Sequence, residues 1–196
     1  MKLLIASNNK HKIDEIKSEI EKNSLDIEII IPSDLSININ PEETSDELEG
    51  NAKIKAHQFY KASGFPVFAD DTGLEVEALS GLPGVKSARY AGENCSYQDN
   101  CDKLLSEMNG KINRSAHFRT VICFYDGIQE KYFEGICKGE ITKEYFGSDG
   151  FGYDPIFSPD GFDLTFSEMS FDKKNEISHR GRAVRNFIDF LKNQIQ

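Results

Sequence analysis

Two adjacent carboxylates, Asp70 and Asp71, follow an apolar run at residues 65–69 and precede Thr72-Gly73. Neighbouring carboxylates repel each other, so a nearby cation is expected to offset the repulsion. Oxygen ligands of this kind suit Mg²⁺ or Mn²⁺. Asp and Gly are also common turn formers, so the same segment fits a solvated turn. If the strand persists through both residues, their side chains point to opposite faces and at most one reaches a metal.

A polar, cationic segment, residues 7–12, lies between an expected strand and an expected helix. Backbone N–H groups at the start of a helix bind anions. Lysines in the first turn oppose the helix dipole, and a bound polyanion would reverse that balance. The alternative is that Lys10 and Lys12 are simply solvated. The sequence has no GxxxxGK[ST] phosphate loop.

Three further segments carry candidate functional groups. Acidic residues before a helix are common, but beside the Asp pair either Glu42 or Glu43 is a candidate second metal ligand. Residues 150–154 place Phe151 and Tyr153 among glycines, where they could stack on a planar base or anchor the core. Residues 173–182 are cationic, and an arginine there could bind a phosphate or a keto oxygen, or the segment could be a solvated basic turn.

Apolar patterning predicts the elements that hold these residues. Strands are expected at residues 3–6, 27–31 and 65–69, the last ending at the Asp pair. Helices are expected after Asn9, from a capping box at 44–47 to about residue 62, after Ser96, and at 178–194. Asp126-Gly127 predicts a hairpin between strands at 116–125 and 128–137. This order indicates an α/β protein with a mixed sheet, as one domain over residues 1–196.

Composition excludes several classes of protein. A net charge of −10 argues against nonspecific binding to a nucleic acid polymer or an anionic membrane. No apolar run approaches the ~20 residues of a membrane span, and we expect no signal peptide at the N-terminus. The four cysteines form no CxxC pair, so we expect reduced structural thiols and a cytoplasmic location.

Together these segments resemble the inosine triphosphate pyrophosphatase family, in order and over nearly the whole chain. The matching blocks are residues 7–12, 42–44, 50–56, 69–74, 81–92, 150–157 and 174–180. The resemblance implies an elongated mixed β-sheet flanked by helices, in two lobes with a central active-site cleft, and a homodimer. It also implies Mg²⁺-dependent hydrolysis of noncanonical purine nucleoside triphosphates (ITP, dITP and XTP) to the nucleoside monophosphate and pyrophosphate.

The same resemblance implies roles for individual residues. Asp71 would be the general base and, with Glu43, a metal ligand, with Glu42 as the alternative. The triphosphate would contact the first cationic segment: Ser7, Asn8, Asn9, Lys10, His11 and Lys12. Thr72 would touch the substrate, and the base and sugar would pack on Phe151, Gly152, Tyr153 and Asp154. Lys174, His179 and Arg180 would complete the pocket, with Arg180 as a reader of the purine 6-keto oxygen.

Two other functions remain open from the sequence. A Maf-like pyrophosphatase would act on pyrimidine or modified nucleoside triphosphates. A noncatalytic nucleotide-binding protein would not need a carboxylate that activates water, so the set of acidic residues favours an enzyme.

Overall fold

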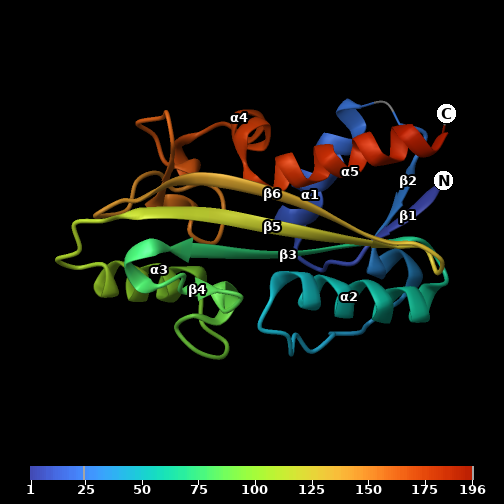
Figure 1. Cartoon of the computed structure of the whole chain (residues 1–196), viewed down its shortest axis with the longest axis horizontal. Coiled ribbons are helices and arrows are strands. Elements are labelled where there is room, and N and C mark those ends of the chain that lie inside the picture. The colour runs from blue at the N-terminus through green and yellow to red at the C-terminus, as the bar shows by residue number, and fades with distance from the viewer. Residues whose placement is uncertain (24, 196) are drawn as a thin grey trace. The chain divides into compact units, whose positions relative to one another are not determined.

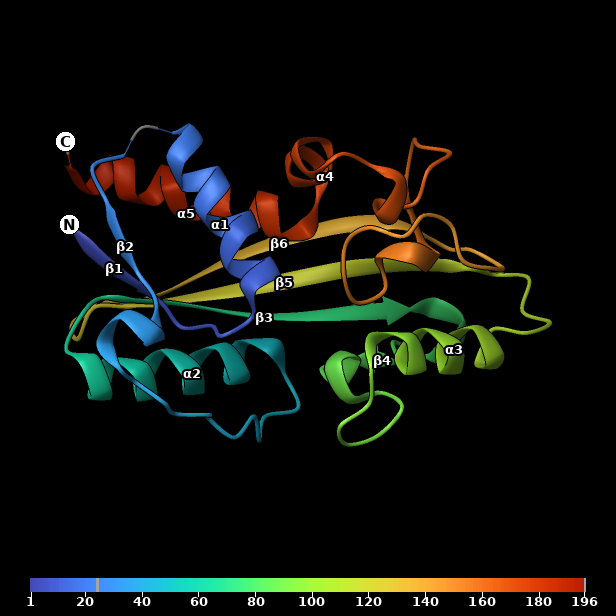
Figure 2. The ribbon, with the colours of Figure 1, turned by 180° about the vertical axis from the view of Figure 1, so that it is seen from behind.

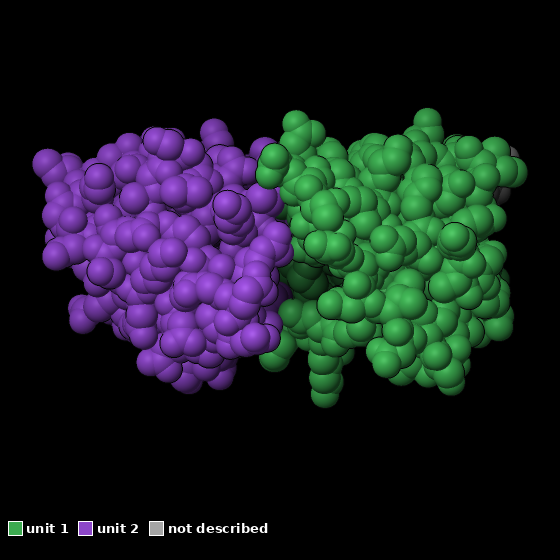
Figure 3. Space-filling model, turned by 90° about the horizontal axis from the view of Figure 1, so that it is seen from below, with its two compact units in different colours: residues 1–71, 120–135, 179–196 green, residues 72–119, 136–178 purple. Residues whose placement is uncertain are grey.

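The structure is a computed structural model that describes residues 1–23 and 25–195, except for the side chain of Ile195. The chain divides into two compact units, which Figure 3 colours separately. Unit 1 contains residues 1–71, 120–135 and 179–196, and unit 2 contains residues 72–119 and 136–178. Three strands include residues of both units: β3 (Val67–Val76), β5 (Ser115–Tyr125) and β6 (Glu130–Ile141). The organisation as a single domain stays a prediction.

The strands form a mixed sheet with the order β2-β1-β3-β5-β6-β7, and β4 pairs with β3. In unit 1, β1 (Lys2–Ile5) lies between β2 (Glu28–Ile30) and β3 and runs parallel to both. The helices of unit 1 are α1 (Lys10–Lys22), α2 (Leu48–Ser63) and α5 (His179–Ile195). The expected α/β class and the hairpin at Asp126-Gly127 are both confirmed.

The helices of unit 1 cover both faces of its strands, with α1 and α5 on one face and α2 on the other (Figures 1 and 2). Side chains alternate along a strand, and the cores follow that alternation. Phe68 packs with Ile16 of α1 and Phe187 of α5, whereas Ala69 packs with Ala52 of α2. Residue 70 of β3 therefore belongs to the face of α1 and α5, and residue 71 to the face of α2.

The start of α2 differs from the sequence prediction. The helix begins at Leu48 with Glu47 as the N-cap, so the capping box expected at residues 44–47 is wrong. Instead, the Asn51 side chain accepts a hydrogen bond from the Ser45 N–H at 2.9 Å and donates one to the Ser45 carbonyl at 3.2 Å. Asn51, a residue of the helix itself, thus holds the segment before α2 in place. The helix therefore starts without Ser, Thr, Asp or Asn at its N-cap.

Unit 2 contains its own core between β3, β5, β6 and the helices α3 (Tyr97–Glu107) and α4 (Phe171–Ile177). The short strands β4 (Pro83–Gly84) and β7 (Phe157–Pro159) pair antiparallel with β3 and β6. The helix expected after Ser96 is confirmed, with Ser96 as its N-cap. The helix expected at residues 178–194 is confirmed as α5, whereas α4 was not predicted; Ser178, with extended backbone (ψ 159°), separates the two helices.

Candidate active site

The Asp pair lies inside a strand, and the turn expected after residue 69 is wrong. β3 continues without interruption from Val67 to Val76, and both side chains are buried. The glycine at 73 is explained by close packing, since a Cβ there would lie 2.8 Å from the Gly84 carbonyl oxygen of β4. Asp70 and Asp71 therefore point to opposite faces of the strand, as the alternation rule predicted.

On the α2 face, Asp71 and Glu43 converge on one ammonium group. Lys55 Nζ lies 2.8 Å from Asp71 Oδ1 and 2.9 Å from Glu43 Oε1. Asn51 Nδ2 donates to Asp71 Oδ2 at 3.4 Å. Both Lys55 and Asn51 come from α2, one turn apart on the same face of the helix. The helix thus holds the carboxylate of Asp71 from two sides.

Burial and charge have opposing effects in this cluster. Burial raises the pKa of Asp71 and the nearby Glu43 raises it further, while Lys55 counteracts both; the pKa remains above its ordinary value. Burial alone would lower the pKa of Lys55, but Asp71 and Glu43 together hold it above the ordinary value. The cluster therefore combines a charged ammonium with a carboxylate of increased basicity.

On the opposite face, Asp70 accepts contacts from two cations. Lys12 Nζ of α1 lies 3.0 Å from Asp70 Oδ2, and Arg180 Nε of α5 lies 3.3 Å from the same oxygen. The Arg180 guanidinium also binds Glu15 of α1 through Nη1, at 2.5 Å. Asp70, Glu15 and Arg180 are almost completely buried. These four side chains form a buried ion-pair network.

The network strongly perturbs its members. Burial alone would raise the pKa of Asp70, but Lys12 and Arg180 hold it well below its usual range. Burial lowers the pKa of Lys12 despite the opposing effect of Asp70. Burial would also lower the pKa of Arg180, yet Glu15 and Asp70 raise it. Asp70 is thus an ionised structural carboxylate, in contrast to its neighbour Asp71.

The first cationic segment forms the start of α1. Asn9 is the N-cap, and its Oδ1 accepts hydrogen bonds from the His11 and Lys12 N–H groups at 3.0 and 3.4 Å. Ser7 Oγ accepts from the Asn9 N–H at 3.1 Å. Asn8, Lys10 and His11 are exposed, whereas Lys12 turns inward to Asp70. The segment therefore presents polar and cationic groups to solvent, and Lys12 alone of its cations joins the buried network.

In unit 2, the segment 150–154 is organised by Asp154. Its Oδ2 accepts a hydrogen bond from the Phe151 N–H at 2.8 Å and binds Lys174 Nζ at 2.7 Å. Lys174 Nζ also lies 4.6 Å from the centroid of the Phe151 ring. Gly150 has a φ of +84°, and a Cβ there would lie 2.3 Å from Asp154 Oδ2. Glycine is therefore required at position 150, and Phe151 is held by its neighbours.

The remaining predicted residues differ in how far they are buried. Tyr153 is a buried core residue whose hydroxyl donates to the Ser87 carbonyl at 2.8 Å, which is the core-anchor alternative considered for it. His179 is buried at the start of α5, and Thr72 is partly buried in β3. Glu42 is exposed, whereas Glu43 contacts Lys55, so the geometry favours Glu43 over Glu42 as the partner of Asp71.

The described residues contain no group of three or more His, Cys, Asp or Glu side chains arranged to hold a metal ion. Glu43 and Asp71 nevertheless place two carboxylates around one cation, Lys55. Mg²⁺ in proteins is commonly held by one or two carboxylates together with substrate phosphates. The pair therefore fits Mg²⁺ that arrives with a phosphate-bearing ligand.

Sequence reasoning did not single out Lys55, Asn51 or Glu15. Lys55 and Asn51 belong to the block 50–56 that matched the family pattern, but lysine and asparagine within a helix ordinarily indicate a solvated face. Glu15 lies between Asp14 and the apolar Ile16. Its place among Ile13, Ile16 and Ile20 on the buried side of α1 was the one available signal, because a buried carboxylate needs a partner.

The fold and these clusters define the class: an α/β protein with a mixed sheet and buried ionic clusters on both faces of one central strand. The chain belongs to the Ham1 family, whose pattern matches residues 3–190. This membership confirms the family resemblance predicted from the sequence motifs. In the part of the chain that the structure describes, no helix is long and apolar enough to cross a membrane.

Relatives and solved structures match this chain over nearly its full length. A protein of Flavobacterium psychrophilum named dITP/XTP pyrophosphatase is 50% identical over 98% of this chain and 100% of its own. The Staphylococcus aureus Ham1 protein structure superposes with a TM-score of 0.89 at 40% identity, covering 99% of this chain and 100% of its own. The structure of a HAM1 protein from Coxiella burnetii superposes with a TM-score of 0.90 at 35% identity, covering 98% of this chain and 99% of its own.

Proposed function

We propose that this protein hydrolyses noncanonical purine nucleoside triphosphates, ITP, dITP and XTP, to the nucleoside monophosphate and pyrophosphate. The observation that carries the proposal is the convergence of Asp71 and Glu43 on Lys55 in a protein of the Ham1 family. Several full-length relatives bear the name dITP/XTP pyrophosphatase. A noncatalytic nucleotide-binding protein would not need a carboxylate held at increased basicity.

Asp71 acts as the general base in this proposal. A water oxygen forms a bond to phosphorus, the α–β phosphoanhydride bond breaks, and the water proton passes to an Asp71 oxygen while pyrophosphate leaves. Asn51 and Lys55 hold the two oxygens of Asp71, which orients its carboxylate. Glu43 and Asp71 would hold Mg²⁺. When bound, the ion would neutralise negative charge on the phosphates.

The start of α1 binds the polyphosphate in this proposal. Lys10 and His11 are exposed there, and Ser7, Asn8 and Asn9 offer neutral polar groups. Lys12 is positioned by Asp70, which is in turn held by Arg180. A triphosphate oxygen would compete with Asp70 for the Lys12 ammonium. The ion-pair network would thus hold a cation close to where the anion binds.

The residues proposed to pack on the base are in unit 2, together with Thr72. Phe151 offers an aromatic face, and Lys174 lies beside it with Asp154. A donor to the purine 6-keto oxygen would reject adenine, whose amino group leaves that donor unpaired. Arg180 was expected to read the 6-keto oxygen, and His179 to help complete the pocket. The contacts of Arg180 with Glu15 and Asp70 favour a positioning role for it, and Lys174 is the donor beside the stacking ring.

A side-by-side substrate panel tests the proposal. We expect Mg²⁺-dependent release of pyrophosphate from dITP, ITP and XTP, and much slower release from ATP, GTP and dUTP. The discrimination against ATP should be large because an unpaired buried donor costs about 1–3 kcal/mol, or about 5- to 150-fold. Faster hydrolysis of dUTP would instead favour the Maf-like alternative, and binding without hydrolysis would favour a noncatalytic protein.

Two finer features also belong to this proposal. We expect a homodimer, which sedimentation of the purified protein at micromolar concentration would test. We also expect a cytoplasmic protein with reduced thiols, since the four cysteines, all within the described residues, form no disulfide. Labelling of the protein in intact cells with a thiol reagent would test the second expectation.

A further inference from the structure

A cluster of ionic contacts and hydrogen bonds joins α2 to the β5–β6 hairpin in unit 1. Its centre is the carboxylate of Glu130, the first residue of β6. Three polar groups contact this carboxylate: Lys53 Nζ at 2.9 Å, His57 Nε2 at 2.5 Å and the Tyr132 hydroxyl at 2.9 Å. We propose that Glu130 is a positioning residue for the reaction, which holds α2 in the rotation that brings Lys55 to Asp71. This inference rests on the proposed function and adds a residue to it.

The contacts of Asp71 and of the hairpin lie on different flanks of α2. Asn51 and Lys55, one turn apart, hold Asp71. Lys53 and His57, also one turn apart, contact the carboxylate in the hairpin. The two pairs are offset by two residues, which is about 200° around a helix of 3.6 residues per turn. One flank of the helix thus reaches β3, and the other flank reaches the hairpin.

Between these flanks, the packing of α2 on the sheet leaves its rotation weakly fixed. Ala52 and Ala56 are the residues of these turns that belong to the core, together with Ala69 of β3. Helices are fixed on their neighbours by side-chain ridges that fit into grooves, and alanine forms only a low ridge. The contacts on the two flanks therefore determine how far the helix is turned about its axis.

The hairpin is a firm support for the second flank. The His57 ring stacks on Tyr125 of β5, with centroids 4.0 Å apart and planes inclined by 12°. The Tyr60 ring of α2 meets the same tyrosine edge-on, with centroids 4.9 Å apart. At Gly127, in the turn of the hairpin, an added Cβ would overlap the Tyr60 hydroxyl. The hairpin therefore packs directly against the helix.

Glu130 is the member of the cluster that its other members share. Burial alone would raise its pKa, but hydrogen bonds from its three partners lower it to about 2, so it is ionised at pH 7. Its removal would release Lys53 and His57 together. These two side chains are 50% and 40% exposed, so water would solvate them and no buried charge would remain unpaired. We therefore expect loss of Glu130 to loosen α2 without unfolding the protein.

The test compares Glu130→Ala with Glu28→Ala. Glu28 pairs with Lys2 at 3.2 Å across β1 and β2, also in unit 1, and this pair includes no residue of α2. Pyrophosphate release from dITP gives kcat and KM. We expect Glu130→Ala to lower kcat about five- to tenfold and to change KM less than about twofold, because displaced groups around a general base slow the chemical step. Glu28→Ala should keep both values of the parent protein.

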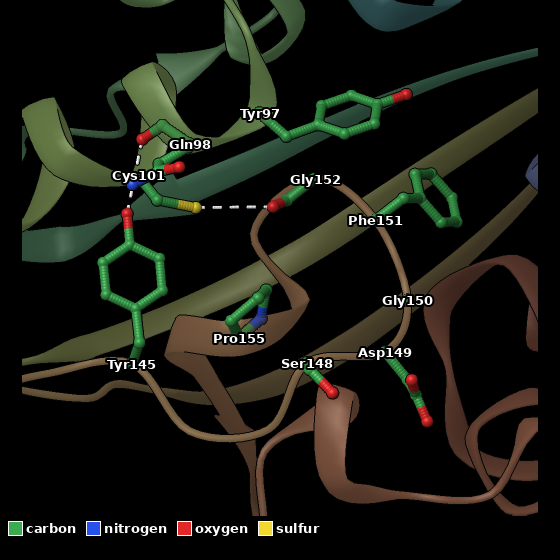
Figure 4. A pocket seen from close by; sticks show the side chains of 10 residues that line it. All are labelled: Tyr97, Gln98, Cys101, Tyr145, Ser148, Asp149, Gly150, Phe151, Gly152 and Pro155. Carbon is green, nitrogen blue, oxygen red and sulfur yellow. Dashed lines mark hydrogen bonds between the residues drawn. The ribbon is translucent and has the colours of Figure 1, made fainter.

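Two tyrosines with similar contacts provide a second, matched comparison. Tyr132 is 41% exposed and donates to Glu130. Tyr145 is 38% exposed and lines a cavity of about 320 Å³ in unit 2 (Figure 4). Its hydroxyl donates to Asp102 at 2.6 Å and to the Gln98 carbonyl at 3.3 Å. Tyr132→Phe should lower kcat about twofold, whereas Tyr145→Phe, which removes a tyrosine–carboxylate bond far from α2 in the sequence, should leave kcat unchanged.

A double variant shows whether Glu130 acts through Lys55. If it does, Glu130→Ala should lower kcat by a smaller factor in a Lys55→Met background than in the parent protein, because the rotation of α2 then no longer places the ammonium group. An unchanged kcat in Glu130→Ala, an equal loss in both backgrounds, or a change confined to KM overturns the inference.

The inference can fail separately from the proposed function. If the parent protein releases no pyrophosphate from dITP, the proposed function fails. Hydrogen exchange of the α2 amides, measured by mass spectrometry at pH 7, then tests the support of the helix directly. Faster exchange over Leu48–Ser63 in Glu130→Ala than in Glu28→Ala supports the role of Glu130 in holding α2. Equal exchange in the two variants overturns it.

Discussion

The same substitution at two neighbouring positions, Asp70→Asn and Asp71→Asn, should have opposite effects on stability. Both side chains are buried in β3, and asparagine has nearly the same shape as aspartate. The pKa of Asp70 is lowered by Lys12 and Arg180 against the effect of burial. The pKa of Asp71 is raised, mainly by burial. Shape and location are thus matched, and only the electrostatic environment differs.

The sign of each effect follows from these pKa directions. A carboxylate whose pKa is lower in the folded state stabilises the fold above its unfolded pKa of about 3.9, and this contribution disappears as the pH falls. A carboxylate whose pKa is raised opposes folding at neutral pH, where it is ionised. At pH 7, Asp70→Asn should therefore destabilise the protein, while Asp71→Asn should leave stability unchanged or increase it.

The contacts of Asp70 indicate how much stability Asp70→Asn should lose. Asp70 is 2% exposed and lies 3.0 Å from Lys12 Nζ and 3.3 Å from Arg180 Nε. Removing one partner of a buried ion pair costs about 3–5 kcal/mol, which lowers the melting temperature of a chain this long by on the order of 10 °C. Asp71→Asn should instead reduce kcat by about 10²–10⁴, as expected for a lost general base.

Urea denaturation at pH 7 and at pH 3 measures both variants against the parent protein. The gap between Asp70→Asn and the parent should be largest at pH 7 and smaller at pH 3, which lies below the unfolded pKa, so that the parent has lost part of the contribution. Equal destabilisation by both substitutions, or a larger loss in Asp71→Asn, would refute the separation of the two carboxylates into different roles.

Two other perturbations test neighbouring parts of the site. In Lys55→Met, Glu43 and Asp71 lose their shared cation, so millimolar Mg²⁺ should raise the melting temperature of the variant by more than that of the parent; equal shifts would count against a metal site at this pair. Gly150→Ala should displace Asp154 and raise KM for dITP, because its Cβ would lie 2.3 Å from Asp154 Oδ2. Gly152 has a φ of +63°, but no atom lies within 4 Å of an added Cβ, so Gly152→Ala should cost only about 1–2 kcal/mol of stability. Similar KM values for Gly150→Ala and Gly152→Ala would contradict this structural difference.

Much of the fold could be predicted from the sequence because local patterns determine it. The apolar spacing of Ile13, Ile16 and Ile20 predicted α1, and Asp126-Gly127 predicted the hairpin of β5 and β6. The alternation of side chains along a strand predicted that Asp70 and Asp71 separate. Each of these inferences uses only near neighbours in the chain.

The remaining features depend on contacts that are distant in sequence. Thr72-Gly73 was interpreted as a turn, but Gly73 is required by the approach of Gly84 in β4. Lys55 became part of the site only because α2 places it against β3. The helix α4 was not predicted, because it has only seven residues and its sequence, FDKKNEI, carries no apolar stripe. In each case tertiary packing decided between two locally acceptable conformations.

The alternation in β3 also restricts how this protein can change during evolution. A one-residue insertion or deletion between Val67 and Asp70 would exchange the faces of every following side chain. Asp71 would then be turned toward α1 and α5 and away from Lys55. Substitutions here can alter one face at a time, but a change in length alters both together. We therefore expect natural variation in this stretch to occur by replacement of residues, with length changes confined to loops such as residues 36–47.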